Sequence, residues 1–565
     1  MPRNAMFLLR FLSIFSLLLP QLVLAQEAPP GQSPDSLPTP PLPQGPAEPA
    51  YTPETPTPTT GVIEAPLPAA ATDENAMTLS VGLTGRVTGQ YNSAFRIDPA
   101  GNSSTSGIEY SSRIRVRADA DTKDGDRRWV VNGTLSVDAI DGVLGGGPDK
   151  EGDKLPGNSA DAVALQDAYI GVHYGKVFGI RVGAMTSHWG TGLVANDGSQ
   201  GLSLERNDWF TLTRAADRNL RVLLHSMPFA LMEDSPLRGL MFLAAFDKVL
   251  DDDTASTTLG QNALQAVGAI RMHLAEKRWF GLYYVRRWQH HDLSALENPG
   301  KDIRVHVVDA AMDLDWRDKD TRKGVRLEAE VAGIMGDTSL SPTPEFPRHD
   351  IQQLGAFARA TYVGVGDTGL TLQLDGGYFS GDANLDDGKL TAFRADRNFR
   401  QGLVLFDRVL AWQTGRAHRT ATDPNLIGVP AEDLDRLASG GAVFDAITVF
   451  PKVGFRITDW LEVYGGALLA WAPAPLVDPL HSRVDAGGQP INFAGEKASS
   501  HYLATEVDLG ARTTWKLPDP WRAAFQVALE QGILLPGGAL GTLSTADHTD
   551  NHAYATRLTV SLLGR

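Results

Sequence analysis

The sequence contains no cysteine, and this absence excludes disulfide bonds, zinc–thiolate centres and thiol nucleophiles together. Basic residues are also in the minority, because 51 Lys and Arg stand against 67 Asp and Glu, for a formal net charge of -16. Binding to nucleic acid requires a basic surface, so we expect no nucleic-acid partner. Only 42% of the 565 residues are hydrophobic, which is too few for a bundle of membrane helices.

The N-terminal residues 1–25 have the composition of a secretory signal peptide. Two arginines precede the apolar run FLSIFSLLLPQLVLA, in which Val23 and Ala25 occupy the small-residue positions of a cleavage site. Pro20 interrupts this run, which is shorter than the roughly 20 residues that a spanning helix needs. A cleaved signal is therefore favoured over a membrane anchor.

The following segment, residues 26–75, holds 14 of the 35 prolines and is rich in Thr, Ala and Glu. Such a composition cannot bury enough apolar surface to offset the entropy lost on ordering. We expect a disordered periplasmic tether, through which periplasmic secretion components could dock.

Residues 76–565 repeat short runs in which apolar and polar residues alternate, separated by Gly, Asp, Asn and Pro. A period of two is typical of strands, and about 10 residues is the length that crosses a bilayer as a tilted strand. Eighteen runs begin near Thr78, Ile108, Arg128, Leu165, Phe178, Asn219, Leu240, Leu264, Trp279, Ile303, Val325, Gln353, Gly369, Ile447, Leu461, Leu503, Arg522 and Tyr554.

The connections between these runs alternate between long and short. DTKDGD and GKV are short, for example, whereas residues 380–444 form a very long connection. Outer-membrane barrels have an even number of strands, short periplasmic turns and long outside loops. The sequence therefore predicts an all-β protein, a single closed antiparallel transmembrane β-barrel of about 18 strands, preceded by the signal peptide and the disordered Pro-rich segment. Its expected location is the outer membrane of a Gram-negative bacterium, in contact with membrane lipid and lipopolysaccharide.

The stretch IEYSSRIRVRADAD places three arginines on one face of the second strand. With a period of two, Arg113, Arg115 and Arg117 share a face, while Ile114 and Val116 lie on the opposite face. The apolar face of a barrel strand contacts lipid, so the arginines are predicted to face the lumen. A barrel of 18 strands is wide enough to leave an aqueous channel unless a loop folds into it.

The same alternation predicts the other charged residues that line the pore and bind the permeant. The basic ones are Arg86, Arg181, Arg221 and Arg557, and the acidic ones are Glu328, Glu330, Asp375, Glu462, Glu506, Asp508 and Glu530. An arginine wall opposite a carboxylate wall would bind anionic or hydroxyl-bearing groups in passing. Alternatively, these charges only pair with one another on neighbouring strands of a hydrated interior and bind no permeant.

Two segments of the chain carry short motifs typical of a known family of barrels. The positions are Ala168-Tyr169, Val182-Gly183, Trp189-Gly190, Ser380-Gly381-Asp382, Asp387-Gly388 and Thr391-Ala392-Phe393. With these motifs the chain resembles the alginate-export family of outer-membrane barrels. This resemblance implies an 18-stranded barrel whose arginine-lined lumen passes an anionic exopolysaccharide. Ala184 stands where that family usually has Arg, and the lumen predicted here is mixed in charge, which leaves the charge of the permeant open.

The sequence therefore predicts a channel rather than an enzyme, with no cofactor and no bound metal. The glycines Gly364, Gly366 and Gly369 spell the dinucleotide-binding pattern, but they connect two strands and open no helix. The first functional hypothesis is a conduit for secretion of an exopolysaccharide, with the glycan as permeant. The alternative is a general or solute-selective diffusion porin.

Overall fold

The computed structural model describes residues 77–564 except 105, 123–128, 141–162, 176, 201–208, 214–215, 233, 253, 256, 258–260, 292–300, 319–320, 340–345, 365–368, 385–386, 422–438, 519–522 and 546–549. The predicted signal peptide and Pro-rich tether lie outside the described residues.

Nearly all of the regular structure is antiparallel β-strand. The strands are β1 (Met77–Asn92), β2 (Gly107–Thr122), β3 (Trp129–Ile140), β4 (Val163–Tyr174), β5 (Phe178–Met185), β6 (Arg218–Ser226), β7 (Leu240–Asp251), β8 (Gln261–Ala275), β9 (Arg278–His291), β10 (Lys301–Asp315), β11 (Gly324–Thr338), β12 (His349–Val363), β13 (Leu370–Phe379), β14 (Lys389–Leu390), β15 (Ala446–Arg456), β16 (Leu461–Trp471), β17 (Tyr502–Lys516), β18 (Ala523–Pro536) and β19 (Ala553–Gly564). The helices are η2 (Leu405–Leu410), α2 (Ala411–Ala421) and α3 (Pro479–Val484). Among the described residues, no helix is long and apolar enough to cross a membrane.

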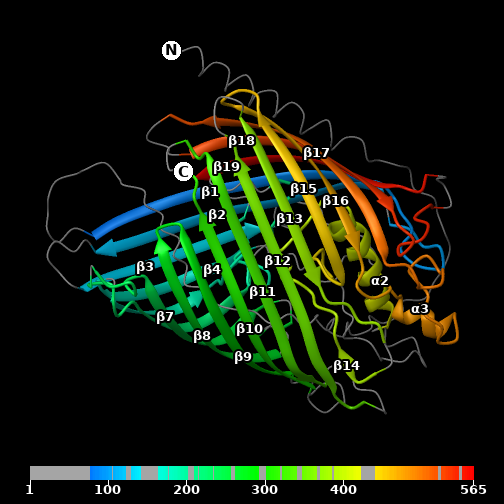
Figure 1. The fold of residues 1–565 in the computed structure, drawn as a ribbon, viewed down its shortest axis with the longest axis horizontal. Coiled ribbons are helices and arrows are strands. Elements are labelled where there is room, and N and C mark those ends of the chain that lie inside the picture. The colour runs from blue at the N-terminus through cyan, green and yellow to red at the C-terminus, as the bar shows by residue number, and fades with distance from the viewer. Residues whose placement is uncertain are drawn as a thin grey trace, which may run out of the picture. The chain divides into compact units, whose positions relative to one another are not determined.

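The strands close into a barrel (Figure 1). Each long strand pairs antiparallel with the next one along the chain, and β1 pairs with β19, where Gly85 lies opposite Leu562. The sheet has 19 strands, of which the two-residue β14 pairs parallel with β12 and takes no part in closure, leaving 18 in the wall. The prediction of a closed 18-stranded antiparallel barrel is confirmed.

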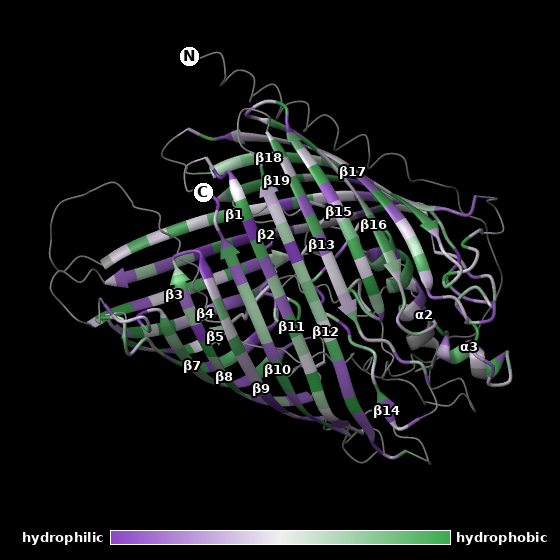
Figure 2. Ribbon diagram, viewed as in Figure 1, coloured by the Kyte–Doolittle hydropathy of each residue, from purple (hydrophilic) through white to green (hydrophobic). Residues whose placement is uncertain are grey.

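The outward face of the wall is apolar. Val81 on β1, Leu509 on β17 and Leu558 on β19 are exposed, and Val81 keeps 69% of its surface accessible. The alternation between apolar and polar residues runs along the strands in Figure 2. A slip of one residue would turn each apolar set inward, so this pattern also fixes the register. Large apolar side chains left exposed all around a closed wall are suited to contact with lipid.

Both ends of the barrel sheet lie at the rim that carries the short turns. Met77 at the start of β1 pairs with Thr122 at the end of β2, and Leu563 near the end of β19 pairs with Ala524 at the start of β18. In outer-membrane barrels the short turns are periplasmic. The opposite rim, which carries the long connections, therefore faces the outside of the cell.

Candidate functional site

The described residues of the connection between β5 and β6, which are 186–200, 209–213 and 216–217, cross the interior of the barrel. We call them the first inward loop. The indole Nε1 of Trp189 donates to Asp309 on β10 at 3.0 Å, and the backbone N–H of Phe210 donates to Glu530 on β18 at 3.0 Å. The carbonyl of Gly198 accepts from Arg113 on β2 at 2.6 Å. Only a loop inside the barrel can contact β2, β10 and β18 together.

The described residues of the connection between β13 and β15, which are 380–384, 387–421 and 439–445, also fold inward, and we call them the second inward loop. Its backbone N–H groups at Val404 and Leu405 donate to Glu506 on β17, at 2.8 and 2.7 Å. Arg408 makes a bidentate ion pair with Glu109 on β2, with both N–H···O distances at 2.6 Å. Helices η2 and α2 belong to this loop, and α2 lies behind β15 and β16 in Figure 1.

Each inward loop is held by a buried glutamate that accepts backbone N–H groups. Glu330 accepts from the N–H of Thr191 and of Leu193, as Glu506 does from residues 403–405. In both loops a glycine with positive φ precedes the first donor: Gly190 at 56° and Gly402 at 75°. A Cβ on Gly190 would lie 2.3 Å from Oε2 of Glu330, and one on Gly402 would lie 2.7 Å from Oε1 of Glu506. Successive N–H groups aimed at one carboxylate form a nest, which holds the loop backbone against the wall.

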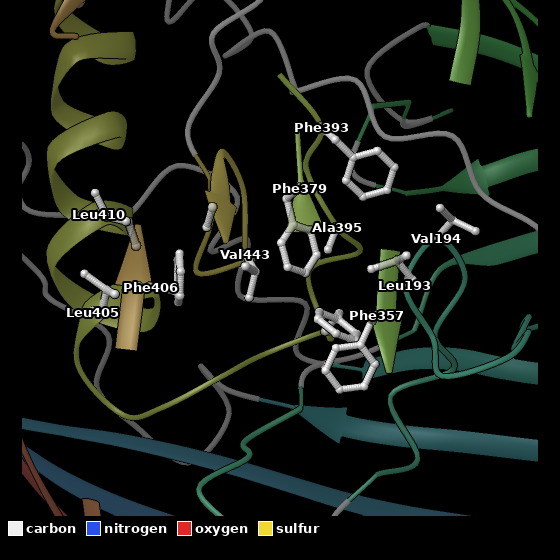
Figure 3. Packing of buried hydrophobic residues seen from close by; sticks show 14 of the residues in the cluster. Leu193, Val194, Phe357, Phe379, Phe393, Ala395, Leu405, Phe406, Leu410 and Val443 are labelled. Atoms are coloured by element: carbon white, nitrogen blue, oxygen red, sulfur yellow. The ribbon is translucent and has the colours of Figure 1, made fainter. Parts of the chain in front are cut away.

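The two inward loops share a hydrophobic core with one side of the wall. Leu193 and Val194 of the first inward loop belong to one buried cluster with Phe393 and Phe406 of the second. Wall residues such as Phe357 on β12 complete the cluster, as Figure 3 shows. Its other wall members come mainly from β7 to β13 and from β15 to β18. Each fully buried Leu or Phe contributes about 1.5–3 kcal/mol, so this packing fixes the loops firmly.

Aromatic contacts extend the packing towards β16. Trp209 of the first inward loop stacks on Tyr464 of β16, with ring centroids 5.3 Å apart and ring planes 9° apart. The Tyr464 hydroxyl donates to Glu530 at 2.9 Å. Phe399 of the second inward loop meets Phe357 edge to face at 4.9 Å. The interior of this half of the barrel is therefore a packed core rather than an aqueous lumen.

The three arginines of β2 project inward, where nearby carboxylates pair with them. Arg113 and Arg115 both bind Asp138 on β3, with N–O distances of 2.8 and 2.7 Å, and Arg117 binds Asp119 at 2.9 Å. Their side chains are 3%, 14% and 25% exposed, so exposure increases from Arg113 towards the short-turn rim. Neighbouring positions of the wall thus supply the partners of this row.

A further carboxylate reaches the arginine row from the first inward loop. Asp197 lies 3.5 Å from His188 and accepts from the hydroxyl of Ser199 at 2.7 Å. Burial alone would raise the pKa of Asp197, but His188, Ser199 and Arg115 together hold this pKa below its ordinary value. An ionised Asp197 therefore reduces the positive potential of the arginine row.

The other predicted basic residues are also inward. Arg221 is fully buried in a pair with Asp247 on β7 at 2.7 Å, and Arg557 binds Glu530 at 2.6 Å. Arg86 donates to a carbonyl of the first inward loop at Thr213. Arg181 lies over the ring of Tyr169, 5.5 Å from its centroid.

The predicted acidic residues fall into two groups. Glu328, Asp375 and Glu462 bind basic side chains of their own wall, namely Arg326 for Glu328, Arg359 and Lys452 for Asp375, and Arg512 for Glu462. Glu330, Glu506 and Glu530 accept hydrogen bonds from backbone N–H groups of the inward loops. Asp508 is fully buried on the same face of β17 as Glu506.

Several partners were not identified from the sequence. Asp138 and Asp309 stand at inward positions of β3 and β10, where alternation alone could have found them. Trp189 and Phe210 reach the wall only through the path of their loop. No local sequence signal predicts such contacts, because they join residues more than 100 positions apart in the chain.

The two halves of the wall differ in how far their inward residues reach solvent. On β2, Glu109, Ser111, Arg115, Arg117 and Asp119 are all partly exposed. On β7 and β8, by contrast, the inward positions from Met241 to Val249 and from Gln261 to Ala269 are buried. β2 thus carries a strip of partly exposed polar residues, although Arg359 on β12 and Arg326 on β11 are partly exposed as well.

No family model matches the sequence, and no curated protein matches it. Solved structures with a similar arrangement include the outer membrane protein opdK from Pseudomonas aeruginosa, at 10% identity and a TM-score of 0.42, covering 85% of this chain and 98% of that one. OccAB1 of Acinetobacter baumannii shares 9% identity at a TM-score of 0.41, covering 85% of this chain and 96% of that one. OccD3 (OpdP) of Pseudomonas aeruginosa shares 9% identity at a TM-score of 0.40, covering 85% and 90%.

Similarity at this level identifies no permeant and adds nothing to the strand pairings on which the fold rests. The closed wall, its apolar outward face and its alternating connections define the chain as an outer-membrane β-barrel. The resemblance to the alginate-export family in particular finds no support in these comparisons.

Proposed function

We propose that the barrel is a selective diffusion channel for small hydrophilic solutes. The observation that carries this proposal is the packed core that both inward loops form with the wall from β7 to β18. Such a core leaves the polar strip along β2 as the route for solutes. Pore diameter and the groups that line a pore govern what passes through it.

The polar strip has the chemistry for weak, repeated contacts with a solute. Arg115 and Arg117 present guanidinium donors, and Asp119 presents a carboxylate acceptor, all of them partly exposed. Alternate residues of a strand lie about 6.6–6.8 Å apart, so a small solute can pass from one group to the next. Conduction requires binding that is favourable enough for entry and weak enough for release.

Secretion of an exopolysaccharide is the weaker hypothesis. A polymer several residues long requires a continuous wide passage, whereas Glu330 and Glu506 fix both inward loops across the interior. Displacing these loops would expose fully buried side chains such as Leu193 and Phe406 and leave backbone N–H groups without partners. The mixed charges of the strip also suit small polar solutes rather than one uniformly anionic polymer.

Swelling of proteoliposomes tests the proposed function. Purified full-length protein is reconstituted and challenged with glucose, glucuronate, maltose and longer malto-oligosaccharides at equal osmolarity. The rate of swelling should fall by about tenfold or more between the monosaccharides and a tetrasaccharide, since pore diameter limits passage. Equal rates for monosaccharides and long oligosaccharides would instead support the secretion conduit.

A further inference from the structure

The outward face of the wall carries a cluster of charged residues at the long-loop ends of β9 to β12. Along β9 the outward residues Phe280 and Leu282 are exposed and apolar, but Arg286 follows on the same face. On β10 the outward Val308 gives way to His306 and then to Arg304. Charged side chains on the lipid-facing side of a barrel are unfavourable near the midplane and tolerated near the interfaces.

The register of the strands places these residues in two rows across the wall. His306 lies opposite Arg286 on one side and Met335 on the other, and Met335 lies opposite Gln352. One step further towards the outside, Arg304 lies opposite Trp288 and Asp337. From Val308 to Leu314 the outward face of β10 is apolar, so both rows stand at the outer edge of the lipid-facing band.

Two carboxylates hold arginines of the outer row in place. Asp302 accepts from Arg304 at 2.7 Å and from Arg348 at 2.6 Å, and Arg348 also pairs with Asp337. The Arg304 side chain is nevertheless 55% exposed and the Arg348 side chain is 39% exposed. Both guanidinium groups are thus oriented by carboxylates and remain partly accessible.

The inner row combines a cation with aromatic rings. Arg286 donates to Nε2 of His306, and the hydroxyl of Tyr284 lies 2.6 Å from Nδ1 of the same ring. Arg286 also lies 5.4 Å from the ring centroid of Trp288. Tyr284 and Trp288 are exposed, and aromatic rings at this depth are suited to the boundary between acyl chains and headgroups.

We propose that Arg286, Arg304 and Arg348 form a binding site for the phosphate groups of lipid A in the outer leaflet. Lipid A is the anionic glycolipid of that leaflet, and both rows stand at the outer edge of the lipid-facing band, where charged side chains are tolerated. Arginine forks match phosphate oxygens in geometry and charge. The apolar outward faces of β9 and β10 below the rows take the acyl chains. This site is on the outside of the wall and is independent of the channel and its permeant.

Native mass spectrometry of the detergent-solubilised full-length protein tests the proposal. The probes are lipid A with both phosphates, the same lipid A after enzymatic removal of its phosphates, and phosphatidylglycerol. The variant carries Arg286→Gln, Arg304→Gln and Arg348→Gln. The matched control carries Arg238→Gln, Lys277→Gln and Lys323→Gln, which remove the same charge at the short-turn rim. Heat-modifiable migration on gels checks that each variant is folded.

The wild-type protein and the control should bind phosphorylated lipid A equally, and the triple variant should bind it on the order of 100-fold more weakly. Each basic residue near an anionic surface contributes roughly a factor of five, and three act together. Undiminished binding of lipid A by the folded triple variant would overturn the proposal. So would equal affinity of the wild-type protein for dephosphorylated lipid A or for phosphatidylglycerol, and these comparisons require no variant.

Discussion

At the scale of single residues, the three arginines of β2 all face the interior of the barrel. They differ in their partners and in their exposure to solvent. Arg113 is buried between Asp138 and the first inward loop, whereas Arg117 remains 25% exposed beside Asp119. Alternation along β2 predicted a common face for these arginines. It could not rank their exposure, because the difference comes from a loop that enters the barrel from β5.

Removing the exposed arginines should change the ion preference of the channel. In the Arg115→Gln, Arg117→Gln variant, Asp138 and Asp119 lose cationic partners, so cations should be favoured over anions. A unit charge about 4 Å from an ion is worth about 1 kcal/mol in water, so removing both charges should change the permeability ratio by up to about thirtyfold. Reversal potentials in planar bilayers under a salt gradient measure this ratio.

Arg359→Gln is the matched control for that measurement. Arg359 is 24% exposed and bound to Asp375, much as Arg117 is 25% exposed and bound to Asp119, but it stands on β12 beside the packed core. Its replacement should shift the reversal potential much less. A shift as large as that of the β2 variant would mean that solutes do not pass along β2.

The opposite change is expected from Asp138→Asn. Asp138 is fully buried and accepts from both Arg113 and Arg115, so the variant leaves two guanidinium groups without their shared carboxylate. Breaking a buried pair in this way costs about 3–5 kcal/mol. The temperature at which the folded band converts to the unfolded band on gels should fall, and the reversal potential should move towards anions. An unchanged conversion temperature would show that Asp138 contributes little.

At the scale of elements, the strands could be predicted and the paths of the loops could not. The alternation that starts near Thr78 or Ile303 repeats at each strand, and the structure places β1 and β10 within two residues of these starts. The inward loops depend on contacts with Glu330 and Glu506, which lie on strands far along the chain. Such distant partners cannot be predicted from the sequence of the loop alone.

Four of the six segments that match in the family resemblance nevertheless fall on these loops, and the other two lie on β4 and β5. Trp189 and Gly190 begin the inward path of the first loop, and Phe393 is fully buried in the core. Asp382 accepts from the N–H of Thr391 at 3.2 Å and closes the first turn of the second loop. These residues therefore stabilise loops that fold into the barrel. Such a role does not depend on which solute passes through.

The two glutamate anchors should control the width of the channel. In Glu506→Gln, the side-chain NH₂ replaces one of the two oxygens that accept N–H groups of residues 403–405, so at least one donor loses its acceptor. Each buried donor left unsatisfied costs about 1–3 kcal/mol. Single-channel conductance should rise and become noisier in Glu506→Gln and in Glu330→Gln.

Glu276→Gln on a short turn, outside the interior, provides the control for the anchors and should leave the conductance unchanged. If both anchor variants conduct as the wild-type protein does, the glutamates do not hold the loops in the conducting state.

At the scale of the whole molecule, the barrel closes between its first and last strands. The pairing of β1 with β19 therefore determines which residues begin and end the barrel. Closure starts with pairs such as Gly85 with Leu562 and requires nothing before residue 77. A chain whose mature part begins at residue 76 should therefore still form the barrel. Heat-modifiable migration on gels would show it, and loss of the folded band would mean that the Pro-rich segment contributes to the fold.

We expect the interior of the barrel to be packed from β7 to β18 and open to water along β2. The chain has no cysteine, so single cysteines can be introduced on a clean background. Ser111→Cys on β2 should react with a small water-soluble methanethiosulfonate reagent, whereas Ala332→Cys on β11 and Ala269→Cys on β8, whose positions are buried, should not. Equally fast reaction at all three positions in the folded protein would contradict the account and indicate a wide, open lumen.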